Sequence, residues 1–322
     1  MNPYTGAGFF EFFWILAKRL CQFIGGEPTL LVSDEIQLIV LGCSAIACGL
    51  LGPFLVLKRI SMFANSLSHT ALLGIVVAFL FASHIWGSRV TDLTTLLLGA
   101  GIAALMTAAL TELLSRLFRL SADASIGISF TLLFALGVLL VSLFTKDAHV
   151  STEAVLGNCD ALQLSDVRFA GSIALCNLIA LCLFFRPFSL ISFDEPFLRA
   201  LGFSAPFWRF CLFFLTALTV IGSFRAVGVL VVLVELTGPY LMVRLFCHRL
   251  NRLVIWTPLC ALFIAFLSVA LSRAVLSWTG IALSTGGILT LVTAILFLGA
   301  ALWRSLSYAQ SPAAKPKAVD SL

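Results

Sequence analysis

The most constraining feature of this chain is a run of about twenty apolar residues that recurs along most of its length. A helix of that length crosses the hydrocarbon core of a bilayer. Only 11% of the residues are charged and 61% are hydrophobic, whereas a soluble domain carries about 25% charged residues. A soluble chain this apolar would have too little polar surface to cover its core. The composition therefore predicts an all-α polytopic membrane protein.

Nine segments are apolar and long enough to be transmembrane helices. They cover residues 36–57, 62–84, 91–113, 125–145, 167–186, 206–222, 225–246, 253–272 and 281–303. Two of their boundaries are ambiguous, so eight or ten helices also fit the sequence. Residues 1–33 are expected to form an N-terminal segment that contains an interfacial amphipathic helix at 9–24. Residues 34–305 are expected to form one membrane domain, and residues 306–322 a disordered tail.

The distribution of Lys and Arg predicts how the chain is oriented. When the loop with Lys58 and Arg59 is placed inside the cell, thirteen of the twenty Lys and Arg residues fall on that side. The other seven fall outside. The C-terminus is therefore expected in the cytoplasm, and nine spans place the N-terminus outside. The net charge of +5 reflects basic residues at helix ends, so no nucleic-acid partner is expected.

Glu235 is the one acidic residue that lies deep inside a predicted helix. An ionised side chain near the bilayer centre costs a few kcal/mol. Gly238 and Pro239 follow directly, and we expect them to loosen the helix. Interrupted helices near the midplane often form solute sites in transporters. Glu235 is therefore a candidate ligand or proton carrier, and the alternative is a protonated carboxyl bonded to a neighbouring helix.

A polar stripe occurs in the apolar segment SMFANSLSHTALLGIVVAFL, residues 61–80. Asn65 and His69 are four residues apart and therefore share one face of a helix. Imidazole is the commonest protein ligand for transition metals, and an amide can add an oxygen ligand. The alternative is a polar contact between two helices. With Glu235 from another helix, Asn65 and His69 are the candidate contacts for a divalent cation.

The connection RPFSLISFDEPFLRALGFSAP, residues 186–206, is longer than two spans require. Ser192 or Asp194 is suited to cap a short helix, and Gly202 is suited to end it. We expect this short helix on the cytoplasmic side, where it would form a docking surface for another protein. An ordinary interfacial helix is the alternative.

Several catalytic motifs are absent from the sequence. There is no GxxxxGK[ST] phosphate-binding loop, so the chain itself is not expected to hydrolyse ATP. The HExxH motif of zinc proteases and the GxSxG nucleophile elbow are also missing. The nine cysteines include no CxxC pair, which argues against a thiolate metal site. The chain is therefore expected to be a non-enzyme without a permanently bound cofactor.

Five segments, taken in order, resemble the ABC-3 family of metal permeases, the membrane subunits of bacterial manganese, iron and zinc importers. They are GLLGPFLVLKRISMFANSLSHTALLGI (49–75), VLGNCDAL (155–162), SFDEPFLRALGF (192–203), AVGVLVVLVELTGPYLMV (226–243) and STGGILTLVTAILFL (284–298). The resemblance implies an ABC transporter permease domain over residues 34–305, in the bacterial cytoplasmic membrane. Its implied partners are cytoplasmic ATPase subunits, a second permease subunit, identical or different, and an extracytoplasmic binding protein that delivers the metal ion.

The resemblance also implies a role for the segment 192–203. In the family this segment is the coupling helix, which sits in a groove of the ATPase. The matching residues here are Asp194, Glu195, Phe197 and Gly202. ATP binding and release would then switch the pathway between outward-facing and inward-facing states.

The metal site departs from the family pattern at one position. His69 matches, but the Asp that the family usually has four residues earlier is Asn65 here. One interpretation is that Glu235 replaces the missing carboxylate. The other is that a different partner permease holds the better ligands.

Two other classes of function stay open at this point. A proton-coupled secondary cation transporter would use Glu235 as its proton carrier, and a membrane scaffold would transport nothing. A Walker-type ATPase that co-purifies with the chain would favour the importer. The sequence does not choose the metal, because imidazole, carboxylate and amide ligands suit several first-row ions.

Overall fold

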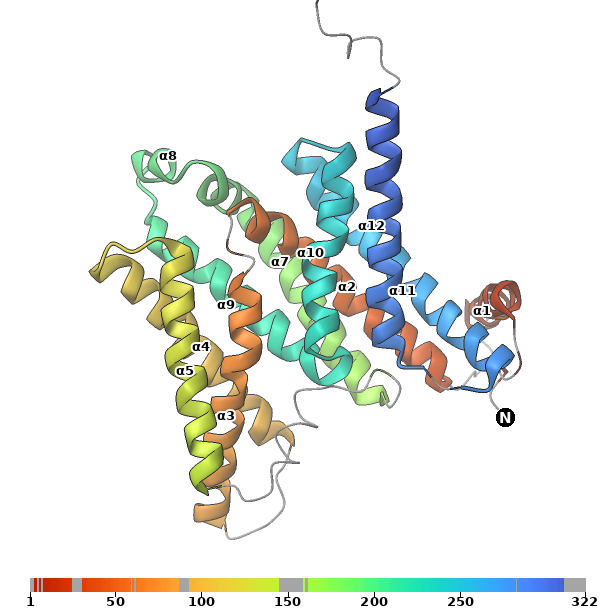
Figure 1. The fold of residues 1–322 in the computed structure, drawn as a ribbon, viewed down its shortest axis with the longest axis horizontal. Helices are drawn as coiled ribbons and strands as arrows, with labels where there is room; N and C mark the ends of the chain where they lie inside the picture. Colours follow the sequence, from red (N-terminus) through yellow and green to blue (C-terminus); the bar gives the residue numbers. More distant parts are fainter. Residues whose placement is uncertain are drawn as a thin grey trace, which may run out of the picture.

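The structure, a computed structural model, describes residues 3–4, 6, 8–24, 31–58, 60, 62–86, 93–144, 159, 162–281 and 283–309. Every regular element in this part of the chain is a helix (Figure 1). The helices are α1 (Phe9–Ile24), α2 (Ser33–Leu57), α3 (Met62–Trp86), α4 (Leu93–Leu117), α5 (Ala122–Phe144), α7 (Leu164–Phe193), α8 (Glu195–Ala200), α9 (Ala205–Val227), α10 (Val229–Phe246), α11 (Leu250–Thr279) and α12 (Thr285–Ala309).

Among the described residues, eight helices are long and apolar enough to cross a membrane, namely α2, α3, α4, α5, α7, α9, α11 and α12. The one predicted span that is not among these eight, 225–246, corresponds to α10, which has 18 residues. Gly228 separates α9 from α10 with a φ of +88°, a conformation that suits Gly and strains other residues. The break therefore lies six residues later than the predicted end of the previous span at 222.

The expected loosening of the helix after Glu235 is wrong. Helix α10 continues without interruption through Gly238 and Pro239 to Phe246. Packing on several sides holds it, because α10 contacts α2, α11 and α12. Pro239 still removes one backbone N–H, which would otherwise bond to the carbonyl of Glu235 four residues earlier.

The connection 186–206 is mostly helical. Helix α7 continues to Phe193, and a kink at Phe184 precedes Pro187 inside it, as expected where a proline ring clashes with the preceding turn. A short helix, α8, is present where the sequence predicted one. Asp194 caps it by accepting a hydrogen bond from the backbone N–H of Phe197, with 3.0 Å between the two atoms.

The helices form two groups that stand side by side (Figure 1). The outer group is α3, α4 and α5, and the central group is α2, α7, α10, α11 and α12. Helix α9 contacts both groups. In the outer group, a Cβ added to Gly74 of α3 would lie 2.1 Å from the carbonyl oxygen of Gly99 of α4. Glycine at this crossing therefore allows the two backbones to touch.

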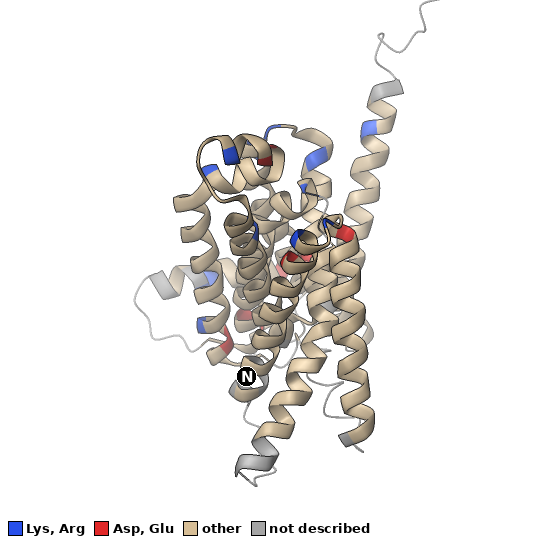
Figure 2. Cartoon of the chain, turned by 90° about the vertical axis from the view of Figure 1, so that its left-hand side faces the viewer, with Lys and Arg blue, Asp and Glu red and all other residues tan. Residues whose placement is uncertain are grey.

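The two ends of the chain differ in how they are attached. Helix α1 is present at the predicted residues 9–24 and packs against α11, while Arg19 forms an ion pair with Glu35 of α2. Helix α12 continues to Ala309. The rest of the predicted tail and most of the segment 155–162 lie outside the described residues. Figure 2 shows most Lys and Arg near helix ends, several of them around α8.

Candidate functional site

His69 and Asn65 lie on one face of α3 in the outer group, as the sequence predicted. The imidazole of His69 is exposed, and Asn65 is half-buried. The ring of His69 contacts the rings of Phe130 and Phe134 on α5, with 5.4 Å between centroids in both cases. One side of the imidazole is thus covered by aromatic side chains while the residue stays accessible from outside the chain.

Glu235 lies in the central group, on α10 where it faces α2, and only 2% of its surface is exposed. Its Oε2 accepts a hydrogen bond of 2.6 Å from the hydroxyl of Ser44. The thiol of Cys48, one turn further along α2, is also within hydrogen-bonding reach of the carboxyl. Its Oε1 has no partner among the described residues. One carboxylate oxygen therefore has unused capacity to bind a proton or a cation.

The predicted metal contacts come from two different groups of helices, His69 and Asn65 from α3 and Glu235 from α10. Within the described residues, no hydrogen bond or ring contact joins Glu235 to His69 or Asn65. No group of three or more His, Cys, Asp or Glu side chains in this part of the chain is placed to hold a metal ion. Any site that includes His69 must therefore draw further ligands from elsewhere.

The outer group contains buried hydroxyl groups that the sequence analysis did not single out. They repeat at a spacing of four residues on three helices: Ser66 and Thr70, Thr107 and Thr111, Ser125 and Ser129. The Thr107 hydroxyl bonds that of Thr70 at 2.9 Å. Four of the six, Ser66, Thr111, Ser125 and Ser129, have no partner among the described residues. The outer group, in which α3 carries His69, therefore buries several hydroxyl groups with unused hydrogen-bonding capacity.

Glu195 of α8 is the centre of an ion-pair network. Its carboxylate pairs with Arg199 at 2.6 Å, with Arg209 of α9 at 2.8 Å and with Lys58 after α2 at 3.7 Å. Burial raises the pKa of Glu195, but the hydrogen bond from Arg199 and the nearby charges of Arg209 and Lys58 outweigh it, so the pKa is lowered. Glu195 is therefore held in its ionised form.

The network continues into the outer group through Glu112 of α4. The two carboxylate oxygens of Glu112 lie 2.9 Å from Arg116 and 3.3 Å from Arg209. The ammonium group of Lys58 also donates to the backbone carbonyl of Ile191 near the end of α7, at 3.1 Å. Burial lowers the pKa of Lys58 to about 8, against the opposing effect of Glu195. Five elements thus meet in one set of charged contacts.

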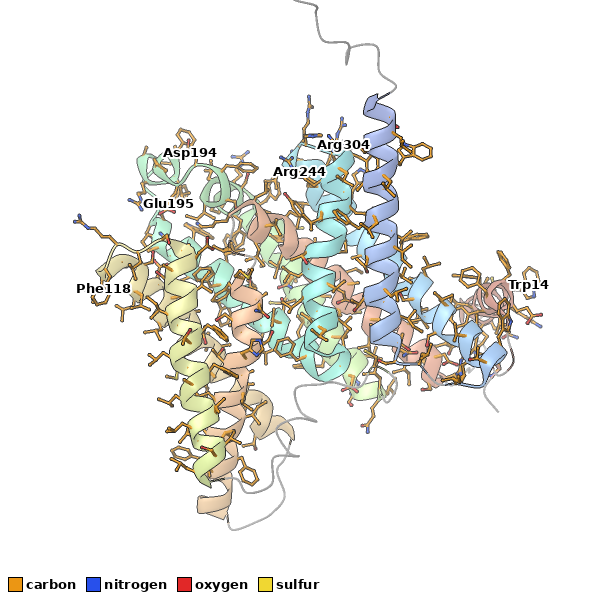
Figure 3. All side chains as sticks on the ribbon, in the orientation of Figure 1. Trp14, Phe118, Asp194, Glu195, Arg244 and Arg304 are labelled. Carbon is orange, nitrogen blue, oxygen red and sulfur yellow. The ribbon has the colours of Figure 1, made fainter. Side chains whose placement is uncertain are left out.

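The remaining predicted residues of α8 point in different directions. Phe197 is half exposed, whereas Leu198 is fully buried and packs with Ile191 and Ala205. Asp194 and Glu195 lie at the same end of the molecule as Arg244 and Arg304 (Figure 3). Gly202 follows the helix with a φ of +84°. Helix α8 therefore shows an aromatic side chain outward and a carboxylate toward the bundle.

Comparison with known proteins supports the fold and the class of protein. PsaBC from Streptococcus pneumoniae, solved in complex with Fab, has a similar fold, with a TM-score of 0.65 and 22% identity. The match covers 87% of this chain and 95% of that chain. A probable metal transport system membrane protein of Chlamydia muridarum is 35% identical over 301 residues, which is 93% of each chain.

A further relative and a family profile agree with these matches. The manganese transport system membrane protein MntD of Bacillus subtilis is 30% identical over 257 residues, which is 73% of this chain and 85% of that protein. The profile of the ABC 3 transport family matches residues 36–304. The chain is therefore a multi-pass membrane protein that belongs to the ABC 3 transport family.

Proposed function

We propose that this chain is the permease subunit of an ATP-binding-cassette importer that carries a divalent transition metal, manganese, iron or zinc, across the cytoplasmic membrane. The family match over residues 36–304 carries the proposal. Relatives that align with most of the chain are named for metal transport and manganese transport. An extracytoplasmic binding protein would deliver the ion, and separate ATPase subunits would supply the energy.

His69, with Asn65 as a weaker neutral ligand, is the proposed contact for the metal in transit. The support is that the imidazole is exposed on the outer group and that its neighbours on α5 are aromatic. Transition metals take roughly four to six ligands, and these two residues supply two. We therefore assign the missing ligands to a second permease subunit that faces this side of α3.

Glu235 is the second proposed contact. The support is the unpartnered Oε1 on a carboxyl that is 2% exposed. Because α2 covers it in this structure, an ion would reach it only after α2 and α10 have moved apart. The Ser44 hydrogen bond would then break, and the carboxylate would exchange a hydroxyl partner for a cation.

Helix α8 is the proposed coupling helix to the ATPase. Phe197 would enter the groove of the ATPase, because it is a half-exposed aromatic side chain on α8. Glu195 would pass the movement of α8 to the bundle through Lys58 and Arg209. The end of α12 lies at the same end of the molecule as α8 (Figure 1), which supports a cytoplasmic C-terminus if α8 faces the cytoplasm.

We also propose that α10 crosses the membrane, in addition to the eight helices α2, α3, α4, α5, α7, α9, α11 and α12. Helix α9 begins next to α8 and ends at the opposite end of the bundle, where α10 begins (Figure 1). Helix α10 returns to the end where α11 starts. Nine crossings with a cytoplasmic C-terminus would place the N-terminal segment outside.

The proposal is tested by metal uptake into proteoliposomes that contain the purified complex. His69→Ala is expected to reduce uptake of Mn²⁺ at least about tenfold, since loss of a ligand contact weakens a metal site by this order. His248→Ala is the matched control, because His248 is an exposed histidine at the turn before α11. Competition among Mn²⁺, Fe²⁺ and Zn²⁺ in the same assay would identify the metal.

Two results would contradict the proposal at different levels. Unchanged uptake in both His69→Ala and Glu235→Ala would refute the assignment of these residues as metal contacts, but not the proposal that the chain is part of an importer. Uptake that survives removal of ATP and stops when the proton gradient collapses would refute the proposal of an ATP-driven importer. Phe197→Ala should release the ATPase during purification, whereas Phe246→Ala, which truncates an exposed phenylalanine at the end of α10, should not.

A further inference from the structure

A basic cavity of about 590 Å³ lies where the end of α4 meets α8 and the start of α9. Four arginines line it: Arg116, Arg119, Arg199 and Arg209. Glu195 is the one carboxylate among its lining residues. Several arginines close together attract anions. A guanidinium group can donate two parallel hydrogen bonds to two oxygens of one phosphate or carboxylate. The cavity is thus a candidate site for an anionic group.

The four arginines differ in how many ion pairs they form and in how exposed their side chains are. Arg209 is held between two carboxylates and is mostly buried. Arg116 and Arg199 each form an ion pair, but 56% and 63% of their side chains stay exposed. Arg119 has no ion pair within the described part of the chain, and its backbone has a φ of +54°, which is uncommon for a residue other than Gly. The cavity therefore has positive charge left for a ligand.

An apolar groove of about 550 Å³ lies further along the same two helices, α4 and α9. Its walls include Ile102 and Leu105 of α4 and Phe214 and Leu218 of α9. All four side chains are well exposed in this structure. They belong to segments that are long and apolar enough to cross a membrane, so the groove would lie at the depth of lipid chains.

The groove begins within about one leaflet's depth of the cavity along both helices. At about 1.5 Å per residue, Leu105 lies roughly 16 Å along α4 from Arg116. Phe214 lies roughly 8 Å along α9 from Arg209 by the same measure. Half of the hydrocarbon core is about 15 Å thick. A molecule with a charged head in the cavity would therefore lay its apolar chain in the groove.

We propose that this surface binds an anionic phospholipid, with its headgroup phosphate in the basic cavity and one acyl chain along the α4–α9 groove. Basic pockets between helices at the membrane surface are typical sites for anionic headgroups. An acidic side chain of a soluble subunit would fill the cavity but leave the groove empty. The bound phosphate would connect Arg119 at the end of α4 to Arg199 of α8. The inference does not depend on which ion is transported.

The first test compares lipids on the unmodified full-length chain by native mass spectrometry. Phosphatidylglycerol and phosphatidylcholine with the same acyl chains are titrated separately, and inorganic phosphate is added as a competitor. We expect phosphatidylglycerol to bind at least about tenfold more tightly, because about two uncompensated cations favour it. Equal binding of the two lipids would overturn the proposal, as would full displacement of the lipid by millimolar inorganic phosphate.

The second test uses charge-matched variants. Arg119→Gln combined with Arg199→Gln is expected to weaken phosphatidylglycerol binding about 25-fold, at about fivefold per arginine. Arg249→Gln combined with Arg252→Gln removes the same charge from exposed positions at the start of α11, and should change binding less than threefold. Equal losses in the two double variants would show general attraction to the surface and contradict a built site.

The groove is tested separately from the cavity. Ile102→Trp should fill the groove and weaken long-chain phosphatidylglycerol while leaving a short-chain form unchanged. Equal effects on both forms would contradict the acyl-chain assignment. Loss of the lipid when the chain is purified with its partner subunits would show that another protein covers this face, and would also overturn the proposal.

Discussion

Glu195 is partly and Glu235 almost fully removed from water, and the molecule accommodates the two carboxyl groups in opposite ways. Glu195 lies at a helix end and meets three cations from three elements. Glu235 lies on α10 against α2, where it accepts a hydrogen bond from Ser44, has the Cys48 thiol within reach and forms no ion pair within the described part of the chain. A carboxylate with several cations is stable when ionised, whereas a lone carboxyl in a membrane needs a proton or a cation.

The difference separates two ways of holding helices together. The Glu195 network has several partners, so α8 can exchange one ion pair for another without leaving a charge alone. The polar neighbours of Glu235, Ser44 and Cys48, both lie on α2, so the contact holds α2 and α10 in a single arrangement. The first region is suited to transmit movement and the second to resist it until a proton or cation arrives.

Removal of the Glu195 charge is expected to have the largest effect on stability. Glu195→Gln leaves Lys58 and Arg209 without their shared carboxylate, and breaking a buried pair costs about 3–5 kcal/mol. Because part of the Glu195 side chain is exposed, we expect a loss of about 2–3 kcal/mol. The measurement is the free energy of unfolding in mixed detergent micelles. Asp123→Asn, at an exposed acid in the first turn of α5, should change it by less than about 1 kcal/mol.

A comparable loss in Glu195→Gln and Asp123→Asn would contradict the network. It would show that the ion pairs around α8 contribute no more than an exposed carboxylate does. A loss in Glu195→Gln that disappears in a Lys58→Met background would instead locate the energy in the Lys58 pair, as a double-mutant cycle shows.

Loss of the hydroxyl bond to Glu235 is expected to have an intermediate effect. Ser44→Ala removes the donor and leaves both carboxyl oxygens without a hydroxyl partner, which costs about 1–2 kcal/mol in a buried setting. Ser268→Ala is the control, because Ser268 is also buried but donates only to the carbonyl of Ile264 in its own helix. Unfolding in the same micelles measures both. If the two serines cost the same, Ser44 does not hold α2 to α10.

The fold was largely predictable because transmembrane helices are specified by local composition. Runs of apolar residues located eight of the helices with ends correct to within seven residues, and Asp194 and Gly202 marked the short helix α8. The misplaced boundary at Gly228 and the continuous helix through Pro239 have another origin. Neighbouring helices decide where a glycine breaks the chain and where a proline is tolerated, and a single sequence does not show those neighbours.

The candidate site was less predictable because its contacts join distant segments. The spacing of Asn65 and His69 correctly placed both on one face of α3, and Glu235 was correctly placed inside a helix. The ion-pair network around Glu195 was not predicted, since Lys58, Glu112 and Arg209 come from three other elements with no shared motif. The excess of Lys and Arg on one side was the one signal that pointed to such a junction.

The effect of Lys58 on the pH dependence of the free energy of unfolding is expected to be the smallest. It tests most directly whether the surroundings of Glu195 differ from those of Glu235. Burial lowers the pKa of Lys58 to about 8 from its ordinary 10.5, with Arg209 reinforcing the effect and Glu195 and Glu112 opposing it. Between these two values the unfolded chain binds more protons than the folded chain, so the free energy of unfolding rises with pH. This stabilisation is complete above about pH 10.5 and is lost as the pH falls through 8.

The test compares unfolding of the natural chain and of Lys58→Met between pH 7 and pH 9. The natural chain should gain about 1 kcal/mol relative to the variant over this interval. Lys58→Arg keeps its charge throughout and should show no gain. Parallel curves for all three proteins would mean that Lys58 is as well solvated as an exposed lysine. The ion pairs around Glu195 would then lie in water. Glu195 and Glu235 would differ in their depth in the protein rather than in the number of their partners.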